Sequence, residues 1–210
     1  MTNNQLHGKK FEDIIKSCGL FLGSADCGRS PTAGFDIEAR FDKVLRLPTS
    51  IKSTGSNIIG LSDARSFFST SEKHRMLIGR YKQVGPHKQF HNVHEFILTR
   101  ETLAKLRGEV TLEDVMAFHN GLLLSNFPIG THAEARKWAR QRKAALAGKQ
   151  SMITLNPKID SKSQRRLQCS LRLSGLIGLC EPGGNYRLHE GSIGDLVLPV
   201  TQISSPRHLP

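Results

Sequence analysis

The 210-residue chain lacks the patterns that mark secreted and membrane proteins. It contains no apolar run close to the ~20 residues that a membrane-spanning helix needs. Its first residues, MTNNQLHGKKFEDIIKSCG, hold no apolar core of the signal-peptide type. These absences favour a cytoplasmic protein that has no membrane partner.

The chain also lacks the short motifs of several enzyme classes. Neither a G-x-x-x-x-G-K-[ST] loop nor a G-x-G-x-x-G turn after a strand is present, which argues against a nucleotide cofactor. A G-x-S-x-G elbow is absent too, so acyl transfer has no support. The four cysteines include no C-x-x-C pair, and we expect free, mostly buried thiols at Cys18, Cys27, Cys169 and Cys180.

Acidic residues are scarce relative to basic ones. The chain has 18 Asp and Glu against 30 Lys and Arg, a net charge of +12, and its pI is near 9.9. A surplus of this size indicates a polyanionic partner, usually nucleic acid. The 38% hydrophobic and 23% charged residues are otherwise ordinary for a globular protein, and the length favours a single domain.

Hydrophobic periodicity predicts a helix, then a cluster of strands, then mixed elements. The expected strands cover residues 34–41, the end of 42–54, 75–83, 90–98 and a short stretch at 152–155. The expected helices cover residues 8–19, a short segment within 61–70, 133–147 and 161–173. This order favours an α/β fold with a mixed central β-sheet flanked by helices. We expect one domain over residues 1–180 and an irregular C-terminal tail over 181–210.

The residues with the clearest chemistry lie on the first two predicted strands. Side chains alternate along a strand, so Asp36 and Glu38 share one face, and Ser50 and Lys52 share one face. If the two strands are neighbours, an acidic pair and an ammonium group converge. Carboxylates bind Mg²⁺, and a lysine stabilises charge on a reacting phosphate. The alternative is that these are solvated surface residues.

At this point the sequence resembles the PD-(D/E)XK nucleases, and particularly the type II restriction endonucleases. The resemblance follows the family's order: G-K-K-F-E at Gly8–Glu12, a strand with Asp36, a strand with S-I-K at Ser50–Lys52, and the stretch SEKHRMLIGRYKQ at Ser71–Gln83. It covers about the first hundred residues, and the rest of the chain matches only in general character.

The resemblance implies roles for individual residues. Asp36 would bind Mg²⁺, the main-chain carbonyl of Ile51 would complete the metal site, and Lys52 would be the catalytic lysine. Glu12 would support the metal or its water from the first helix. The implied activity is sequence-specific hydrolysis of double-stranded DNA by in-line attack of water activated at the metal. The implied assembly is a homodimer, which suits cleavage of both strands of a palindrome.

The sequence departs from the family pattern at two positions. Phe35 stands where the family name places proline, and Ser50 stands where the second acid is expected. Some restriction enzymes have S-x-K at this place and take the missing carboxylate from another element. Glu38 and Glu12 are the candidates here, and Glu38 is preferred because it shares the predicted strand face of Asp36.

A basic stretch over residues 133–172 is the candidate DNA-binding region. It holds eleven Lys and Arg against two acids, a net charge of +9. A basic face of this kind binds phosphates, and Arg and Gln side chains can read base edges in the major groove. The alternative is a solvated basic helix. The residues that we expect to contact DNA are Arg136, Arg140, Lys143, Lys162, Gln164, Arg165, Arg166 and Gln168.

Other functions remain open. The histidines at 87, 91 and 94 would suit a zinc site on a helix, but their segment reads better as a strand. A repair or homing nuclease of the same fold is one rival to a restriction enzyme. A DNA-binding protein without catalysis is the other, and the serine at position 50 keeps this second rival open.

Overall fold

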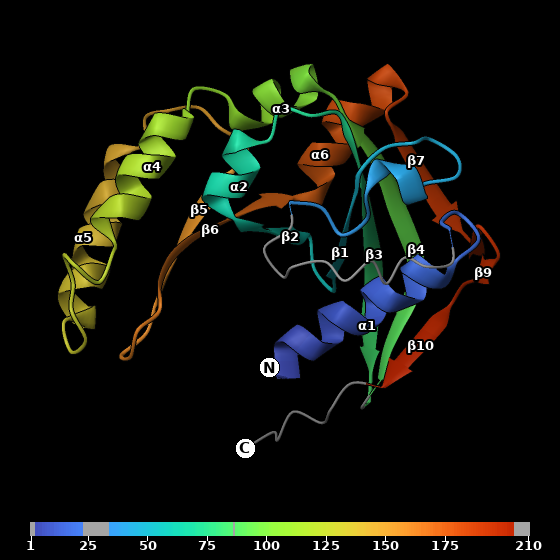
Figure 1. Cartoon of the computed structure of the whole chain (residues 1–210), viewed down its shortest axis with the longest axis horizontal. Coiled ribbons are helices and arrows are strands. Elements are labelled where there is room, and N and C mark those ends of the chain that lie inside the picture. Colours follow the sequence, from blue (N-terminus) through green and yellow to red (C-terminus); the bar gives the residue numbers. More distant parts are fainter. Residues whose placement is uncertain (1–2, 23–33, 86, 204–210) are drawn as a thin grey trace. The chain divides into compact units, whose positions relative to one another are not determined.

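A computed structural model describes residues 3–22, 34–85 and 87–203 of the chain (Figure 1). The fold is mixed α/β with a central mixed sheet flanked by helices, which confirms the predicted fold class. The chain forms two compact units, where the sequence led us to expect one domain over residues 1–180. Unit 1 comprises Met1–Asn57, Lys73–Thr99 and Ile177–Pro210, and unit 2 comprises Ile58–Glu72 and Arg100–Leu176.

Unit 1 is built on a five-stranded sheet. Its strands run in the order β1-β3-β4-β10, and β7 also pairs with β4. Only the β1–β3 pair is parallel. The long strands β3 and β4 confirm the two strands predicted at 75–83 and 90–98. The bounds are Thr49–Thr54 for β1, His74–Val84 for β3, His87–Leu98 for β4, Tyr186–Glu190 for β7 and Val200–Ile203 for β10.

Helix α1 (Asn3–Ser17) packs against this sheet and confirms the helix predicted at 8–19. Its side chain Phe11 is buried and stacks on Phe90 of β4, with ring centroids 4.2 Å apart. Gly79 of β3 gives this ring its space, because a Cβ added at Gly79 would lie 2.2 Å from Phe11. The core around Phe11 also contains Ile51 and Leu77 on the same face of the sheet.

The strand predicted at 34–41 is not formed. Ile37 makes an isolated antiparallel bridge with Thr49, and the chain then turns through a short 3-10 helix, η1 (Ala39–Phe41). The N–H groups of Asp36 and Ile37 both donate to the carbonyl of Thr49, at 2.9 and 3.0 Å. Two donors on one carbonyl end the ladder after a single pair, so the alternating sequence does not continue as a strand.

The segment predicted as an irregular tail, 181–210, contains strands within its described part. β7 and β10 pair with β4, and β8 (Ser192–Ile193) pairs with β9 (Leu196–Val197) after the 3-10 helix η2 (Glu181–Gly183). Ile193 and Leu198 are buried in the core of unit 1. The prediction of an irregular tail is therefore wrong for this part, whose glycines Gly184, Gly191 and Gly194 lie in turns next to short strands.

Unit 2 is a three-stranded antiparallel sheet with helices. The strands run in the order β2-β6-β5. Thr111 and Asp114 form a capping box at the start of α4, and the Asp63 side chain caps α2. The bounds are Ile58–Asp63 for β2, Ala64–Ser69 for α2, Arg100–Arg107 for α3, Leu112–Gly121 for α4, His132–Ala145 for α5, Thr154–Ile159 for β5 and Arg165–Arg172 for β6; α6 (Leu173–Cys180) is divided between the units.

The helix predicted at 161–173 is wrong. Residues 160–164 form a turn, and β6 follows it. Buried residues alternate along β6 at positions 165, 167, 169 and 171, which is the period of a strand and not of a helix. The helix predicted at 133–147 is confirmed as α5, and the strand expected near 152–155 is found as β5.

Three cysteines are described, and each has a free, buried thiol, as the sequence predicts. Burial raises the pKa of Cys169 to about 12 and that of Cys180 to about 11, so both thiols stay protonated at neutral pH. Cys27 lies outside the described residues. No helix in the described part of the chain is long and apolar enough to cross a membrane.

We predict that Gly79→Ala destabilises the protein by about 1–3 kcal/mol, because the new methyl group must displace the Phe11 ring in a packed core. Gly60→Ala is the matched control, since it is also a strand glycine but has nothing within 4 Å of the added Cβ. Urea denaturation of the two variants measures the difference. Equal midpoints for both would contradict the proposed close packing at Gly79.

Candidate active site

Asp36 and Lys52 lie together at the edge of the five-stranded sheet, as the sequence predicts. Lys52 Nζ is 3.4 Å from Asp36 Oδ2, and the same oxygen accepts a 2.6 Å hydrogen bond from the N–H of Ile51. The side chains of Lys52 and Asp36 are 20% and 26% exposed. The pair is therefore partly sheltered but still open to a substrate.

The backbone of β1 presents a further oxygen at this edge. In an extended strand, the N–H and C=O groups of one residue point toward the same neighbour. The N–H of Ile51 points to Asp36 and away from β3, so its carbonyl faces the same edge. Mg²⁺ in proteins is held through one or two carboxylates and keeps several waters. The Asp36 carboxylate and the Ile51 carbonyl fit such an ion as part of its ligand set.

Among the described residues, the contacts of the two candidate acids lie elsewhere. Glu38 was expected on a strand face with Asp36, but that strand is not formed, and Glu38 instead pairs with Arg40 at 2.9 Å. Glu12 lies on α1 and forms an ion pair with Lys16. Among the described residues, no three His, Cys, Asp or Glu side chains are grouped as metal ligands. This also leaves the zinc alternative without support from the described histidines.

Ser50, at the position of the missing acid, is a buried residue of β1. It shares a face of the sheet with Lys52, because side chains alternate along the strand and Ile51 points into the core on the other face. Its hydroxyl group cannot replace a carboxylate as an anionic metal ligand. The site therefore has a lysine, one acid and a main-chain carbonyl, and the described residues group no second acid with them as a metal ligand.

The sheet face that carries Lys52 also holds polar residues that the sequence analysis did not select. Lys52 pairs in register with Ile78, which pairs with His94, and Arg80 lies two residues beyond Ile78 on the same face. The Nε of Arg80 is buried and makes no hydrogen bond within the described part of the protein. Only the strand register places Arg80 beside Lys52, and no local motif in the sequence indicates it.

His94 is a buried, neutral histidine on this face. Burial lowers its pKa to about 4, with further lowering from the charges of Arg80 and His91. Its Nδ1 lies 2.9 Å from the hydroxyl group of Tyr186 on β7, and the two rings stack. The pair links β4 to β7.

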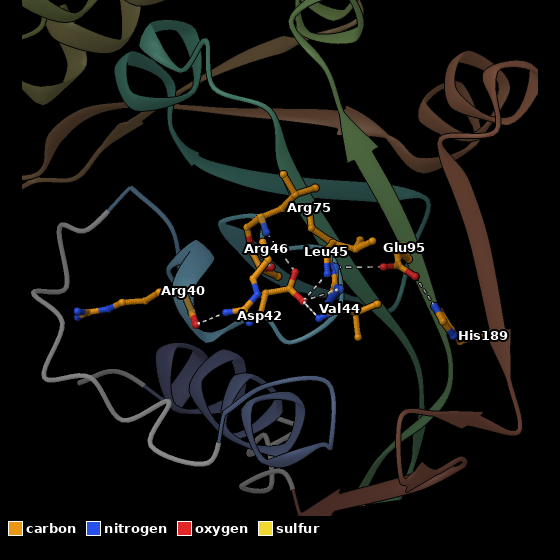
Figure 2. Close-up of polar contacts among 10 residues, drawn as sticks. Arg40, Asp42, Val44, Leu45, Arg46, Arg75, Glu95 and His189 are labelled. Carbon is orange, nitrogen blue, oxygen red and sulfur yellow. Dashed lines mark hydrogen bonds and ion pairs between the residues drawn. The ribbon is translucent and has the colours of Figure 1, made fainter.

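A buried ionic network fixes the loop between η1 and β1 (Figure 2). Arg75 of β3 and Asp42 are 1% and 0% exposed and are joined by a 3.2 Å contact from Nη2 to Oδ1. Arg75 Nε also approaches Glu95 of β4 at 3.1 Å, and His189 of β7 contacts Glu95 at 2.7 Å. Burial by itself raises the pKa of Glu95, but the bond with His189 and the charge of Arg75 outweigh it, and the pKa is lowered.

The same carboxylate shapes the loop that leads into β1. Asp42 Oδ1 accepts hydrogen bonds from the N–H groups of Val44 and Leu45, at 3.0 and 3.1 Å. The N–H of Arg75 donates to the carbonyl of Pro48, immediately before β1. The network therefore sets where β1 begins, and with it the position of Lys52.

The expected DNA-contacting residues lie on two elements of unit 2. Arg136, Arg140 and Lys143 are exposed on α5, and Arg136 donates to the carbonyl of Ile159 at 3.0 Å. The other five lie in the turn after β5 or on β6: Lys162, Gln164, Arg165, Arg166 and Gln168. Since β6 is a strand, Arg165 and Arg166 point to opposite faces and not to one helical face as expected.

Arg165 is buried, and its guanidinium group is held by main-chain carbonyls. It is 7% exposed, and its guanidinium group donates to the carbonyls of Asp160, Gln164 and Pro128 at 2.9, 2.9 and 3.3 Å. Arg166, by contrast, is exposed, and Gln168 lies on the same face of β6 and is partly exposed.

Comparisons of the chain with models of protein families, with curated proteins and with solved structures give no match.

We predict that Arg75→Met destabilises the protein by about 3–5 kcal/mol, because it leaves the buried Asp42 carboxylate without a compensating charge. Arg40→Met is the matched control, because the ion pair of Arg40 with Glu38 is exposed and contributes at most about 1 kcal/mol. Chemical denaturation monitored by circular dichroism gives both values. A loss at Arg75 no larger than that at Arg40 would show that the buried pair is not needed for stability.

We also predict a pH dependence from His94. Its pKa is about 4 in the folded protein and near 6.5 when unfolded, so the unfolded state binds the proton more readily. The stability linked to neutral His94 is complete above pH 6.5 and decreases by up to about 3 kcal/mol as the pH falls toward 4. His94→Gln removes this term, so the stability difference between wild type and variant should shrink from pH 7 to pH 4.5. A constant difference would refute the assignment.

Proposed function

We propose that this protein is a magnesium-dependent endonuclease that hydrolyses phosphodiester bonds of double-stranded DNA at specific sequences. The observation that carries the proposal is the meeting of Asp36 and Lys52 at the edge of the sheet, 3.4 Å apart, with the Ile51 carbonyl facing the same edge. The sequence order and this geometry agree with the PD-(D/E)XK pattern. Together with the net charge of +12, they favour a polyanionic phosphodiester substrate.

The residues of the site have distinct tasks in this proposal. Asp36 and the Ile51 carbonyl would hold the metal ion. Bound Mg²⁺ would supply stabilisation of negative charge on the phosphate and lower the pKa of water. The Lys52 ammonium group would orient the attacking water and stabilise the charge that develops on the phosphate oxygens. Arg80, on the same sheet face, would hold a phosphate oxygen near Lys52.

The test is cleavage of mixed plasmid and phage DNA in the presence of Mg²⁺. We expect discrete fragments from the wild type and none in EDTA. Lys52→Ala should reduce the cleavage rate by about 10²–10³-fold, since one charge-stabilising group is lost at the phosphate. Asp36→Asn should lower it at least as much, because it removes the metal-binding charge. Lys82→Ala, an exposed lysine on β3, is the matched control and should cleave at the wild-type rate.

Two further variants test whether Glu38 or Glu12 supplies a second acid when the metal binds. Glu38→Gln and Glu12→Gln each keep size and hydrogen-bonding capacity but remove one negative charge. Removal of the acid that completes the metal site should raise the Mg²⁺ concentration needed for half-maximal cleavage, and the other substitution should leave it unchanged. DNA binding in EDTA should persist in both variants. A homodimer stays a prediction, which a sizing column with and without DNA would test.

The second candidate is a DNA-binding protein without catalysis. Ser50 at the place of the second acid, and the lack of a three-ligand metal group among the described residues, favour it. In that case the wild type would bind DNA with steep salt dependence and would give no Mg²⁺-dependent fragments. The cleavage experiment therefore separates the two candidates directly.

A further inference from the structure

The hairpin of β5 and β6 has one apolar face and one polar face. Leu155, Leu167 and Cys169 are buried, and α5 packs against β5. The side chains that alternate with these residues along β5 and β6 point to the opposite face of the hairpin. Six of these define what we call the ribbon face: Asn156, Lys158, Arg166, Gln168, Ser170 and Arg172.

The strand register arranges the ribbon face in cross-strand pairs. Lys158 lies opposite Arg166, and Asn156 lies opposite Gln168. Lys158 and Arg166 are exposed, and Asn156 and Gln168 are partly exposed. The face therefore presents a pair of cations beside a pair of amides, and none of its six residues is acidic.

The outer part of the hairpin is only two strands wide (Figure 1). The pairing of β2 with β6 ends at Asp63 and Gln168, so the hairpin beyond Gln168 has no third strand. Pro157 lies in this part of β5, where it faces a sheet edge and cannot donate a hydrogen bond to a further strand. Between Gln168 and its turn, the hairpin is thus a two-stranded ribbon, whereas Gln168, Ser170 and Arg172 lie beside β2 in the three-stranded part of the sheet.

The turn of the ribbon is held by specific hydrogen bonds. Asp160 Oδ1 accepts from the N–H groups of Lys162 and Gln164, at 3.0 and 2.8 Å. Arg165 ties the turn to the carbonyl of Pro128 before α5. Because these bonds fix the hairpin before any partner arrives, little conformational entropy is lost when its face binds a rigid surface.

We propose that the ribbon face docks in the major groove of double-stranded DNA. That groove is about 12 Å wide and admits a two-stranded β-ribbon, and amide and guanidinium side chains form paired hydrogen bonds with adenine and guanine edges there. Lys158 and Arg166 supply the charge complementarity to the phosphates on either side. The Asn156–Gln168 pair supplies groups of the base-reading kind.

The chemistry of the face favours duplex DNA over other polyanions. Single-stranded nucleic acids are bound by stacking on aromatic side chains, and the ribbon face has none. The major groove of duplex RNA is too narrow and deep for side chains to read. Insertion into a membrane surface needs bulky apolar residues, which this face also lacks.

The test is binding of the full chain to duplex DNA in EDTA, measured by fluorescence anisotropy over a range of salt concentrations. Lys158→Ala/Arg166→Ala should weaken binding by about 10-fold or more and reduce the salt slope by about 2, one for each phosphate that is no longer neutralised. Arg100→Ala/Lys105→Ala, two exposed cations on α3, is the charge-matched control and should leave the slope within about 1 of wild type.

Sequence reading is tested with Gln168→Ala. A preferred duplex is first selected with the wild type from a randomised library, and its affinity is compared with that of a scrambled duplex. The variant should lose about 5- to 150-fold of this preference while binding the scrambled duplex as before. Gln141→Ala, an exposed glutamine on α5, is the matched control and should keep the preference.

This inference rests on the proposed function for the choice of DNA, but the two fail separately. Suppose that the wild type cleaves DNA and that the Lys158, Arg166 and Gln168 variants bind and discriminate as the wild type does. The docking proposal is then refuted, and the proposed nuclease activity is supported. If these variants lose binding and the wild type shows no Mg²⁺-dependent cleavage, the docking proposal is supported and the proposed nuclease activity is refuted. Equal losses in the α3 control, or stronger binding to single strands, duplex RNA or anionic vesicles, would overturn the docking proposal.

Discussion

The buried charge of Arg75 is the constraint on which unit 1 depends. A guanidinium group that is 1% exposed is costly to bury unless carboxylates compensate it, and Asp42 and Glu95 do so from two sides. Asp42 can reach Arg75 only if the loop before β1 takes one path. Because that path leads directly into β1, the ion pair of Arg75 and Asp42 also helps to set the position of Lys52 next to Asp36.

The elements that could be predicted from the sequence are those whose local pattern and final environment agree. β3 and β4 each contain apolar and β-branched or aromatic residues at strand-like positions, and α5 is a run of strong helix formers, so the sequence predicts the right type for all three. The sequence of β6 predicts a helix because its Arg, Leu and Gln favour helices intrinsically. Pairing with β5 and β2 on both sides overrides that preference, and single-sequence propensities do not contain it.

The candidate site was predictable in part, where the local sequence pattern agrees with the final environment of the residues. Asp36 and Lys52 were expected to converge from their order and spacing, and they do lie together in the structure. The expected role of Glu38 required a strand over residues 34–41. That strand is not formed, because two N–H groups share the carbonyl of Thr49 and the chain then turns through η1. Arg80 and the Arg75 network depend on the register of distant strands. These residues come together only in the tertiary fold, and no short sequence motif encodes their proximity.

The interleaved path of the chain has a consequence for how the protein folds during synthesis. The chain passes from one unit to the other four times, and the strands β7 and β10, which complete the sheet of unit 1, come from its last segment. β4 is therefore made about a hundred residues before β7 and β10, which pair with the edge of β4 that does not face β3. In a nascent chain on the ribosome, this edge of β4 stays without its partner strands during that interval, and an exposed strand edge favours pairing with other chains.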